Sequence, residues 1–153
     1  MGVGPAMVKP KKLGHLVLRV RDLTRSERFY VNVLGLNVRE KLSGEMVFLN
    51  ASDGASHELA LVAAGEDAGK PKVNGAGLYH FAWEMESFEE LRVMYRDLIE
   101  KGINIEGIGD HGISLGVYFS DPDGNNIEVF YELPKEQWPE RDVFSGKFPW
   151  RLD

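Results

Sequence analysis

The sequence predicts an α+β fold built from two copies of one βαβββ module, which form one open, cup-shaped mixed sheet with the helices outside. Internal repetition is the first observation, because three short segments recur in the same order in both halves of the chain. The matched pairs are 13–17 with 78–82, 35–38 with 102–105, and 53–59 with 123–129. The second observation is that each half has one amphipathic helical pattern among alternating stretches that are typical of strands.

The first module begins with an alternating stretch over 13–20, which predicts a strand. A helix is expected to start at Thr24, because Glu27 follows three residues later with the spacing of a capping box. Gly35 is expected to end this helix, since glycine accepts the positive φ found at that position. Three short strands are expected next, at 37–42, 45–50 and 57–63, with a tight turn at 43–44 between the first two.

The second module repeats this order. A strand at 77–85 precedes Ser87, whose capping partner is Glu90, and Gly102 closes the helix. The strands that follow are expected at 103–108, 115–120 and 126–131.

The predicted organisation has one domain between two terminal segments. It consists of a flexible N-terminal arm at 1–10, a domain at 11–133 and an aromatic tail at 134–153. Within the domain the modules span 11–64 and 77–133, joined by an exposed linker rich in Gly, Ala, Lys and Asp. The aromatic tail is expected to cover its own barrel or to contact a partner chain.

Composition and charge exclude several classes of function. Lys and Arg number 18 against 24 Asp and Glu, which gives a formal net charge of −6, and the basic residues form no face for nucleic acid. The chain has no cysteine, which excludes disulfides, thiolate nucleophiles and cysteine-ligated metals. No apolar run approaches the about 20 residues that span a bilayer, and the N-terminus lacks a signal-peptide core. We therefore expect a cytoplasmic protein with neither nucleic-acid nor membrane partners.

Two histidines and one glutamate form the candidate metal site. Alternation along the first strand places His15 on the concave face of the cup, and the repeat places His80 at the equivalent point. Glu128 lies in the middle of an apolar strand, where a carboxylate should not be buried unpaired. Two imidazoles and one carboxylate suit non-haem Fe(II), and Mn(II) or Zn(II) less distinctively. From the residues alone, a metal triad and a buried Glu128 paired with a cation are both open.

The opening of the chain resembles the vicinal oxygen chelate superfamily, which includes glyoxalase I, bleomycin- and fosfomycin-resistance proteins and type I extradiol dioxygenases. The resemblance is carried by 14–23, Phe29-Tyr30 and 33–36, and it covers about residues 11–133. That family is built from paired βαβββ modules, and its members are commonly dimers or larger. The resemblance therefore implies this fold and a homodimer or higher homo-oligomer.

Further segments resemble the small one-domain members of the extradiol branch, the catechol 2,3-dioxygenases. These segments are 57–61, 111–114, 118–125 and 128–130. The resemblance implies that the metal ligands are His15, His80 and Glu128. It also implies that His57 is the acid/base group near bound O₂, and that His111 and Tyr118 hydrogen-bond the substrate oxygens. The interval between His111 and Tyr118 is short beside the larger enzymes of this branch.

The leading hypothesis is therefore ring cleavage of a catechol-type diol by O₂ at Fe(II), with a small aromatic diol as substrate. The alternative is a glyoxalase-like lyase, isomerase or thiol transferase that uses Zn(II), Ni(II) or Mn(II). That enzyme is expected to need a ligand from Glu58, which the repeat makes the counterpart of Glu128. On a regular strand His57 and Glu58 point to opposite faces, and we expect His57 inward and Glu58 at the edge. A third hypothesis is a small-molecule-sequestering resistance protein.

Overall fold

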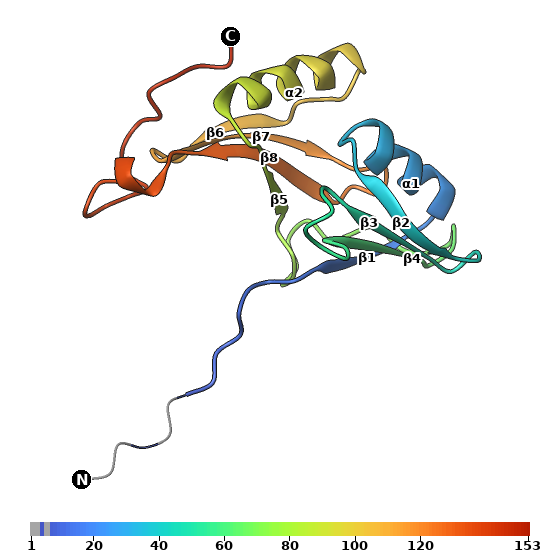
Figure 1. Cartoon of the computed structure of the whole chain (residues 1–153). Coiled ribbons are helices and arrows are strands. Elements are labelled where there is room, and N and C mark those ends of the chain that lie inside the picture. Colours follow the sequence, from blue (N-terminus) through green and yellow to red (C-terminus); the bar gives the residue numbers. More distant parts are fainter. Residues whose placement is uncertain (1–3, 5–6) are drawn as a thin grey trace. The chain divides into compact units, whose positions relative to one another are not determined.

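The computed structural model describes residue 4 and residues 7–153 of the chain. Two compact units are present, one ending at Asp67 and the other beginning at Ala68 (Figure 1). Of the predicted N-terminal arm at 1–10, residues 1–3 and 5–6 lie outside the described residues, and residues 7–10 form neither helix nor strand. None of the described helices is long and apolar enough to cross a membrane.

The first unit is a four-stranded mixed sheet with one helix. Its elements are β1 (Leu16–Val20), α1 (Leu23–Asn32), β2 (Asn37–Leu42), β3 (Met46–Asn50) and β4 (Leu59–Ala63). The strand order is β1-β4-β3-β2, in which β1 runs parallel to β4 and the other pairs are antiparallel. Helix α1 packs on β3 and β4. This is the predicted βαβββ order.

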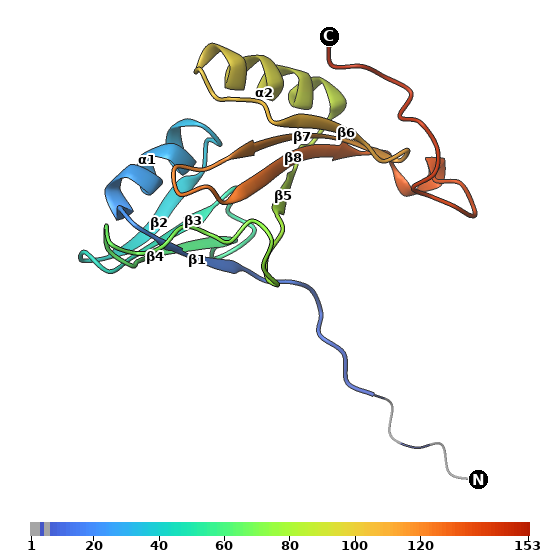
Figure 2. The same ribbon diagram turned by 180° about the vertical axis from the view of Figure 1, so that it is seen from behind.

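The second unit repeats that topology. Its elements are β5 (Phe81–Glu84), α2 (Phe88–Glu100), β6 (Gly107–Asp110), β7 (Ser114–Ser120), β8 (Asn126–Glu132) and the short η1 (Lys135–Gln137). The strand order is β5-β8-β7-β6, again with a parallel first pair, and α2 lies along one face of this sheet (Figure 2). The α+β class and the two βαβββ modules are confirmed. The joining of both sheets into one cup stays a prediction.

Helix boundaries follow capping chemistry, with one correction. The side chain of Ser87 accepts the Glu90 N–H at 3.1 Å, as predicted. The predicted Thr24 cap of α1 is wrong, because the Asp22 carboxylate accepts the Arg25 N–H at 2.9 Å and the helix starts earlier. An aspartate caps as well as a hydroxyl residue, and its charge also favours the positive end of the helix dipole.

Most of the remaining boundary predictions differ by a few residues at the strand ends. The strand expected at 103–108 is wrong over its first four residues, because β6 begins at Gly107, where its pairing with Tyr118 of β7 starts. Gly35 and Gly102 follow the two helices with φ of 70° and 72°, as expected for residues that end helices. Strand β5 begins at Phe81 rather than at residue 77, because pairing with β8 starts at Phe81 and Ile127. Hydrophobic alternation predicts the centre of a strand, while pairing with its neighbour decides where the strand ends.

In each unit, one face of the sheet packs against the helix and forms the core, and the opposite face carries the polar residues. In β1, Leu18 and Val20 are buried while Val17 and Arg19 are exposed. In the second unit the buried hydrophobic residues that α2, β7 and β8 contribute are Leu91, Leu98, Leu115, Val117, Phe119, Ile127 and Val129. The polar residues between them therefore lie on the face of the sheet away from α2.

The C-terminal tail packs on its own unit. Phe148 and Leu152 are only 6% and 4% exposed. The Phe148 ring lies 5.6 Å from the Phe88 ring of α2 and 5.3 Å from the Trp150 ring. The tail thus contacts its own unit, and its contact with a partner chain stays a prediction.

Candidate metal-binding and catalytic site

Two rows of paired residues cross the free face of the second sheet. Because paired residues on neighbouring strands share a face, each row can be followed from β5 through β8 and β7 to β6. The first row is Ala82, Glu128, Tyr118 and Gly107, and the second is Glu84, Phe130, Gly116 and Gly109. These two rows contribute Glu128 and Tyr118 to the candidate site, and residues next to the strands contribute the rest.

The carboxylate of Glu128 is buried over a glycine. The residue is 7% exposed. A Cβ atom at Gly116 would overlap Glu128 Oε1, so only glycine at this position leaves room for the carboxylate. In the described part of the chain, the imidazoles of His80 and His111 both lie within 4.0 Å of this carboxylate. The negative charge is thus buried beside nitrogen ligands rather than beside Lys or Arg.

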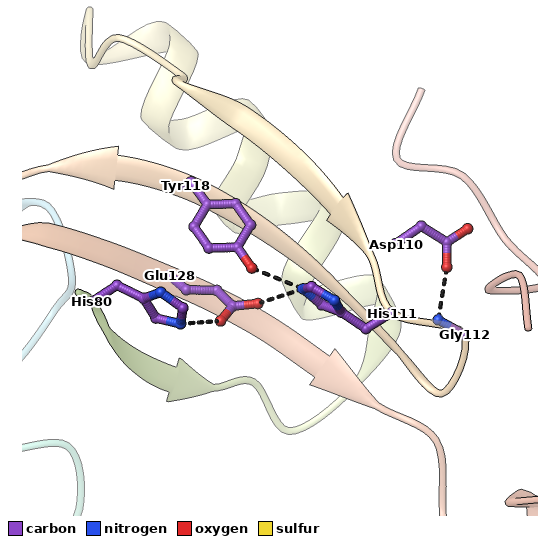
Figure 3. A network of polar contacts seen from close by, with 6 residues as sticks. All are labelled: His80, Asp110, His111, Gly112, Tyr118 and Glu128. Atoms are coloured by element: carbon purple, nitrogen blue, oxygen red, sulfur yellow. Dashed lines mark hydrogen bonds and ion pairs between the residues drawn. The ribbon is translucent and has the colours of Figure 1, made fainter. Parts of the chain in front are cut away.

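His80 and His111 approach Glu128 from opposite sides (Figure 3). His80 Nε2 lies 3.2 Å from Glu128 Oε2, and His111 Nε2 lies 4.0 Å from Oε1. His80 precedes β5, and His111 lies in the turn between β6 and β7. The buried Nδ1 atom of His80 has no hydrogen-bond partner in the described structure.

Tyr118 joins the same network. Its hydroxyl lies 2.8 Å from His111 Nε2, and a Cβ atom at Gly109 would lie 2.8 Å from the Tyr118 ring and 3.0 Å from His111 Nε2. Burial, followed by the negative charge of Glu128, raises the pKa of Tyr118 to about 12. The phenol is therefore a neutral hydrogen-bond donor at neutral pH.

The first unit brings His15 and His57 together. Their ring centroids lie 4.5 Å apart, and the Phe48 ring meets the His57 ring edge-on at 5.3 Å. His57 Nδ1 lies 3.0 Å from Ser56 Oγ, which leaves Nε2 for other partners. Glu58 Oε2 accepts the Ala51 N–H at 3.0 Å, so its carboxylate is held by the loop of its own unit.

Strand register corrects the expected counterpart of Glu128. With His15 matched to His80, Val17 corresponds to Ala82, and their partners on the parallel strand are Ala60 and Glu128. The counterpart of Glu128 is therefore Ala60, and the expectation of Glu58 is wrong. The connection from β1 to β4 is shorter than that from β5 to β8. Residues of the same type in the two sequence repeats therefore do not occupy equivalent positions in the two sheets.

The strand register also identifies an equivalent pair of positions that the similarity between the two sequence repeats does not show. Phe48 pairs with Ala60, just as Tyr118 pairs with Glu128. The first unit thus carries Phe48 and Ala60 where the second carries Tyr118 and Glu128. These pairs can be found from the sequence by counting residues from the centre of each predicted strand, rather than by aligning identical residue types.

The donor set of the second unit fits a divalent metal. Across residue 4 and residues 7–153, no group of three or more His, Cys, Asp or Glu side chains already converges as a metal-holding group. His80 and Glu128 do present an imidazole nitrogen and a carboxylate to one point, and a divalent cation would compensate the buried charge. The pair therefore suits two of the three predicted ligands.

Comparison with known proteins gives a family match over most of the chain. A model of the Glyoxalase/Bleomycin resistance protein/Dioxygenase superfamily matches residues 12–129. A catechol-2,3-dioxygenase of Bacillus subtilis (strain 168) is 38% identical over 126 residues, which are 82% of this chain and 43% of that protein. Biphenyl-2,3-diol 1,2-dioxygenase 3 of Rhodococcus globerulus is 32% identical over 80% of this chain and 64% of its own length. This chain thus spans less than two thirds of both relatives.

Two other similar proteins bear the name lactoylglutathione lyase, and a third is a domain that shares the fold. A probable lactoylglutathione lyase of Synechocystis is 30% identical over 80% of this chain and 96% of its own length. The crystal structure of a lactoylglutathione lyase from Agrobacterium tumefaciens superposes with a TM-score of 0.64 at 26% identity, over 80% of this chain and 94% of that one. A domain from Frankia sp. EAN1pec, 20% identical over 81% of this chain and 99% of its own, reaches a TM-score of 0.68 and shows the shared fold.

Proposed function

We propose that this chain, which belongs to the Glyoxalase/Bleomycin resistance protein/Dioxygenase superfamily, is an extradiol dioxygenase that cleaves the ring of a catechol-type substrate with O₂. The observation that carries the proposal is the polar network of the second unit, in which Glu128 lies between His80 and His111 with Tyr118 beside it. The similarity to two dioxygenases supports the same choice.

The proposed metal ligands are His80 and Glu128 of the second unit and His15 of the first. Fe(II) is the metal that this donor set favours, and Mn(II), Zn(II) and Ni(II) are the alternatives. When bound, the metal supplies the redox and Lewis-acid chemistry that allows O₂ to react with a bound diol. The third ligand, His15, rests on the sequence repeat and stays a prediction.

His111 and Tyr118 are proposed to bind the substrate oxygens. Their mutual hydrogen bond of 2.8 Å fixes both groups beside the Glu128 carboxylate. Because the pKa of Tyr118 is raised to about 12, its hydroxyl keeps its proton and can donate a hydrogen bond to an anionic diol oxygen. Phe130, which is paired with Gly116, offers an apolar surface to the ring on the same face.

His57 is proposed to take and return the proton that ring cleavage requires. An imidazole is the side chain suited to this exchange near neutral pH. The contact of His57 Nδ1 with Ser56 Oγ fixes one ring nitrogen and leaves Nε2 for the substrate side. Its ring stacks on His15, so the proposed proton carrier is held next to a proposed ligand.

The second candidate function is a glyoxalase-like lyase, isomerase or thiol transferase. The Synechocystis relative favours it, since the match covers 96% of that protein. Two observations disfavour the glyoxalase-like function. Ala60 occupies the position where a carboxylate ligand from the first module is expected, and Glu58 is hydrogen-bonded to the Ala51 N–H.

Oxygen consumption separates the two functions. Protein loaded anaerobically with Fe(II) is given a panel of substituted catechols in an oxygen electrode, with Zn(II)-loaded protein as the matched control. The dioxygenase proposal predicts uptake in the iron form alone, together with a yellow ring-opened product. If protein with measured bound iron takes up no oxygen with any catechol, while Glu58→Gln abolishes a lyase or isomerase activity, the proposal is wrong.

A further inference from the structure

His111 reaches the site from a tight turn that is itself held in place. Residues 111–113 connect β6 to β7, and the His111 N–H donates to the Ser114 carbonyl at 2.9 Å. Gly112 is buried with a φ of 80°, a left-handed conformation that favours glycine. Its N–H donates to Asp110 Oδ1 at 2.9 Å. The direction of the His111 side chain therefore depends on how Asp110 fixes the turn.

The same carboxylate oxygen ties the turn to the C-terminal tail. The Phe148 N–H donates to Asp110 Oδ1 at 2.8 Å, across 38 positions in the sequence. The backbones also touch, because a Cβ atom at Gly112 would lie 2.9 Å from the Gly146 nitrogen. The tail therefore lies directly against the turn that carries His111.

The tail is held on the second unit by contacts of its own, so the segment that the turn packs against is itself fixed. Phe148 is 6% exposed and packs against Phe88, and Arg92 Nε donates to the Leu152 carbonyl at 3.3 Å. These contacts involve α2 rather than β6 or β7. Asp110 thus connects the turn to a segment that α2 holds independently.

We propose that Asp110 and the tail are positioning elements that hold His111 against Tyr118 and beside Glu128. Asp110 accepts hydrogen bonds from the Gly112 and Phe148 N–H groups and acts on His111 through the turn. The catalytic consequence rests on the proposed function, since it requires that His111 bind the substrate. The structural consequence is an ordered contact between His111 and Tyr118, and it does not depend on the proposed function.

Variants at Asp110 and Gly112, with a control variant at Gly146, test the proposal in the chain of 153 residues. Asp110→Ala removes the acceptor of both N–H groups, while Asp110→Asn keeps an oxygen there and is the conservative rescue. Gly112→Ala pushes a methyl group into the Gly146 backbone. Gly146→Ala is its matched control, because a Cβ atom there makes only an ordinary contact of 3.8 Å with Gly112 Cα.

The first readout is made by NMR on metal-free protein. In Asp110→Ala we expect amide exchange at Gly112 and Phe148 to rise about tenfold or more, because each N–H loses a charged acceptor. The nuclear Overhauser contacts between the His111 and Tyr118 rings are expected to weaken at the same time. Asp110→Asn and Gly146→Ala are expected to keep both signals.

The second readout is ring cleavage by the iron-loaded enzyme. A displaced His111 is expected to lower kcat by about a hundredfold in Asp110→Ala and Gly112→Ala, with substantial rescue in Asp110→Asn. Unchanged amide exchange and unchanged ring contacts in both impaired variants would overturn the positioning role. If Asp110→Ala does not fold, equal behaviour of Gly112→Ala and Gly146→Ala overturns it instead. Absence of ring cleavage in the wild-type chain would count against the proposed function alone, since the NMR readout needs no activity.

Discussion

At the scale of single residues, the site depends on where side chains are missing. Glu128 is buried because Gly116 leaves the space that its carboxylate fills, and Gly109 does the same for the Tyr118 and His111 pair. A carboxylate buried in this way needs a compensating partner, and imidazoles surround it. The two glycines are therefore as much part of the site as the residues that carry the chemistry.

Replacement of Gly116 tests this dependence. In Gly116→Ala the added methyl group displaces the Glu128 carboxylate, so we expect affinity for Mn(II) or Fe(II) to fall about tenfold or more. Gly107→Ala is the matched control on β6, because a Cβ atom there has no neighbour within 4 Å. Metal affinity is measured by calorimetric titration under anaerobic conditions. Equal affinity in the two variants contradicts the assigned place of Glu128.

Removal of a proposed ligand and of the proposed proton carrier should have different effects. His80→Ala is expected to lose both bound iron and turnover, because it deletes an imidazole that faces Glu128 at 3.2 Å. His57→Ala is expected to keep its iron and lose turnover. Iron content is measured by elemental analysis after loading, beside oxygen uptake. Full activity in an iron-free His80→Ala protein contradicts the ligand assignment.

At the scale of elements, the sequence was sufficient for the order of helices and strands and for most strand centres, but the centre of the strand expected at 103–108 lies outside β6 (Gly107–Asp110). Ser87 and the glycines that end both helices are local signals, and local signals can be read from the chain. Thr24 was misread as a cap because Asp22, two residues earlier, offers an equally good acceptor. The four site residues of the second unit were also chosen from the sequence, although the contacts between them require the folded register.

Register is the part that the sequence did not specify. The apparent match of Glu58 to Glu128 fails because loop length decides which residues become partners, and Ala60 takes the equivalent place. The role of Asp110 was equally hidden, since its second partner, Phe148, lies 38 positions away. Contacts between distant segments depend on tertiary packing rather than on local pattern.

The neighbouring strands β5 and β8 also place two carboxylates close together. Burial, followed by the charge of Glu84, raises the pKa of Glu132 above its ordinary value of 4.5. A raised pKa in the folded state means that the protonated form favours folding. This contribution is complete below about pH 4.5 and is lost as the pH rises through the folded-state pKa.

Glu132→Gln is therefore expected to raise the melting temperature at pH 7 to 8, with a gain that shrinks toward pH 4. Exposed Glu140, for which Glu140→Gln is made in parallel, is the control and is expected to change the melting temperature little at any pH. Thermal unfolding followed by circular dichroism measures both. A gain for Glu132→Gln that grows toward low pH would contradict the assigned direction.

At the scale of the whole molecule, the two modules share a topology and differ in chemistry. The second unit carries His80, His111, Tyr118 and Glu128 on one face, and the first has Phe48 and Ala60 at the positions of Tyr118 and Glu128. Duplication of a module thus preserved the scaffold, while only one copy holds a carboxylate at this position. This asymmetry favours the two-histidine, one-carboxylate set over a set with a carboxylate from each module.

Oxygen isotope labelling of the product tests the central claim most directly. Iron-loaded protein is incubated with the preferred catechol under ¹⁸O₂, and the product is analysed by mass spectrometry. The proposed dioxygenase is expected to place both oxygen atoms of one O₂ molecule in a ring-opened product cleaved beside the diol. A product that forms without isotope incorporation, or an isomer of the substrate with its ring intact, would contradict the claim and favour the glyoxalase-like function.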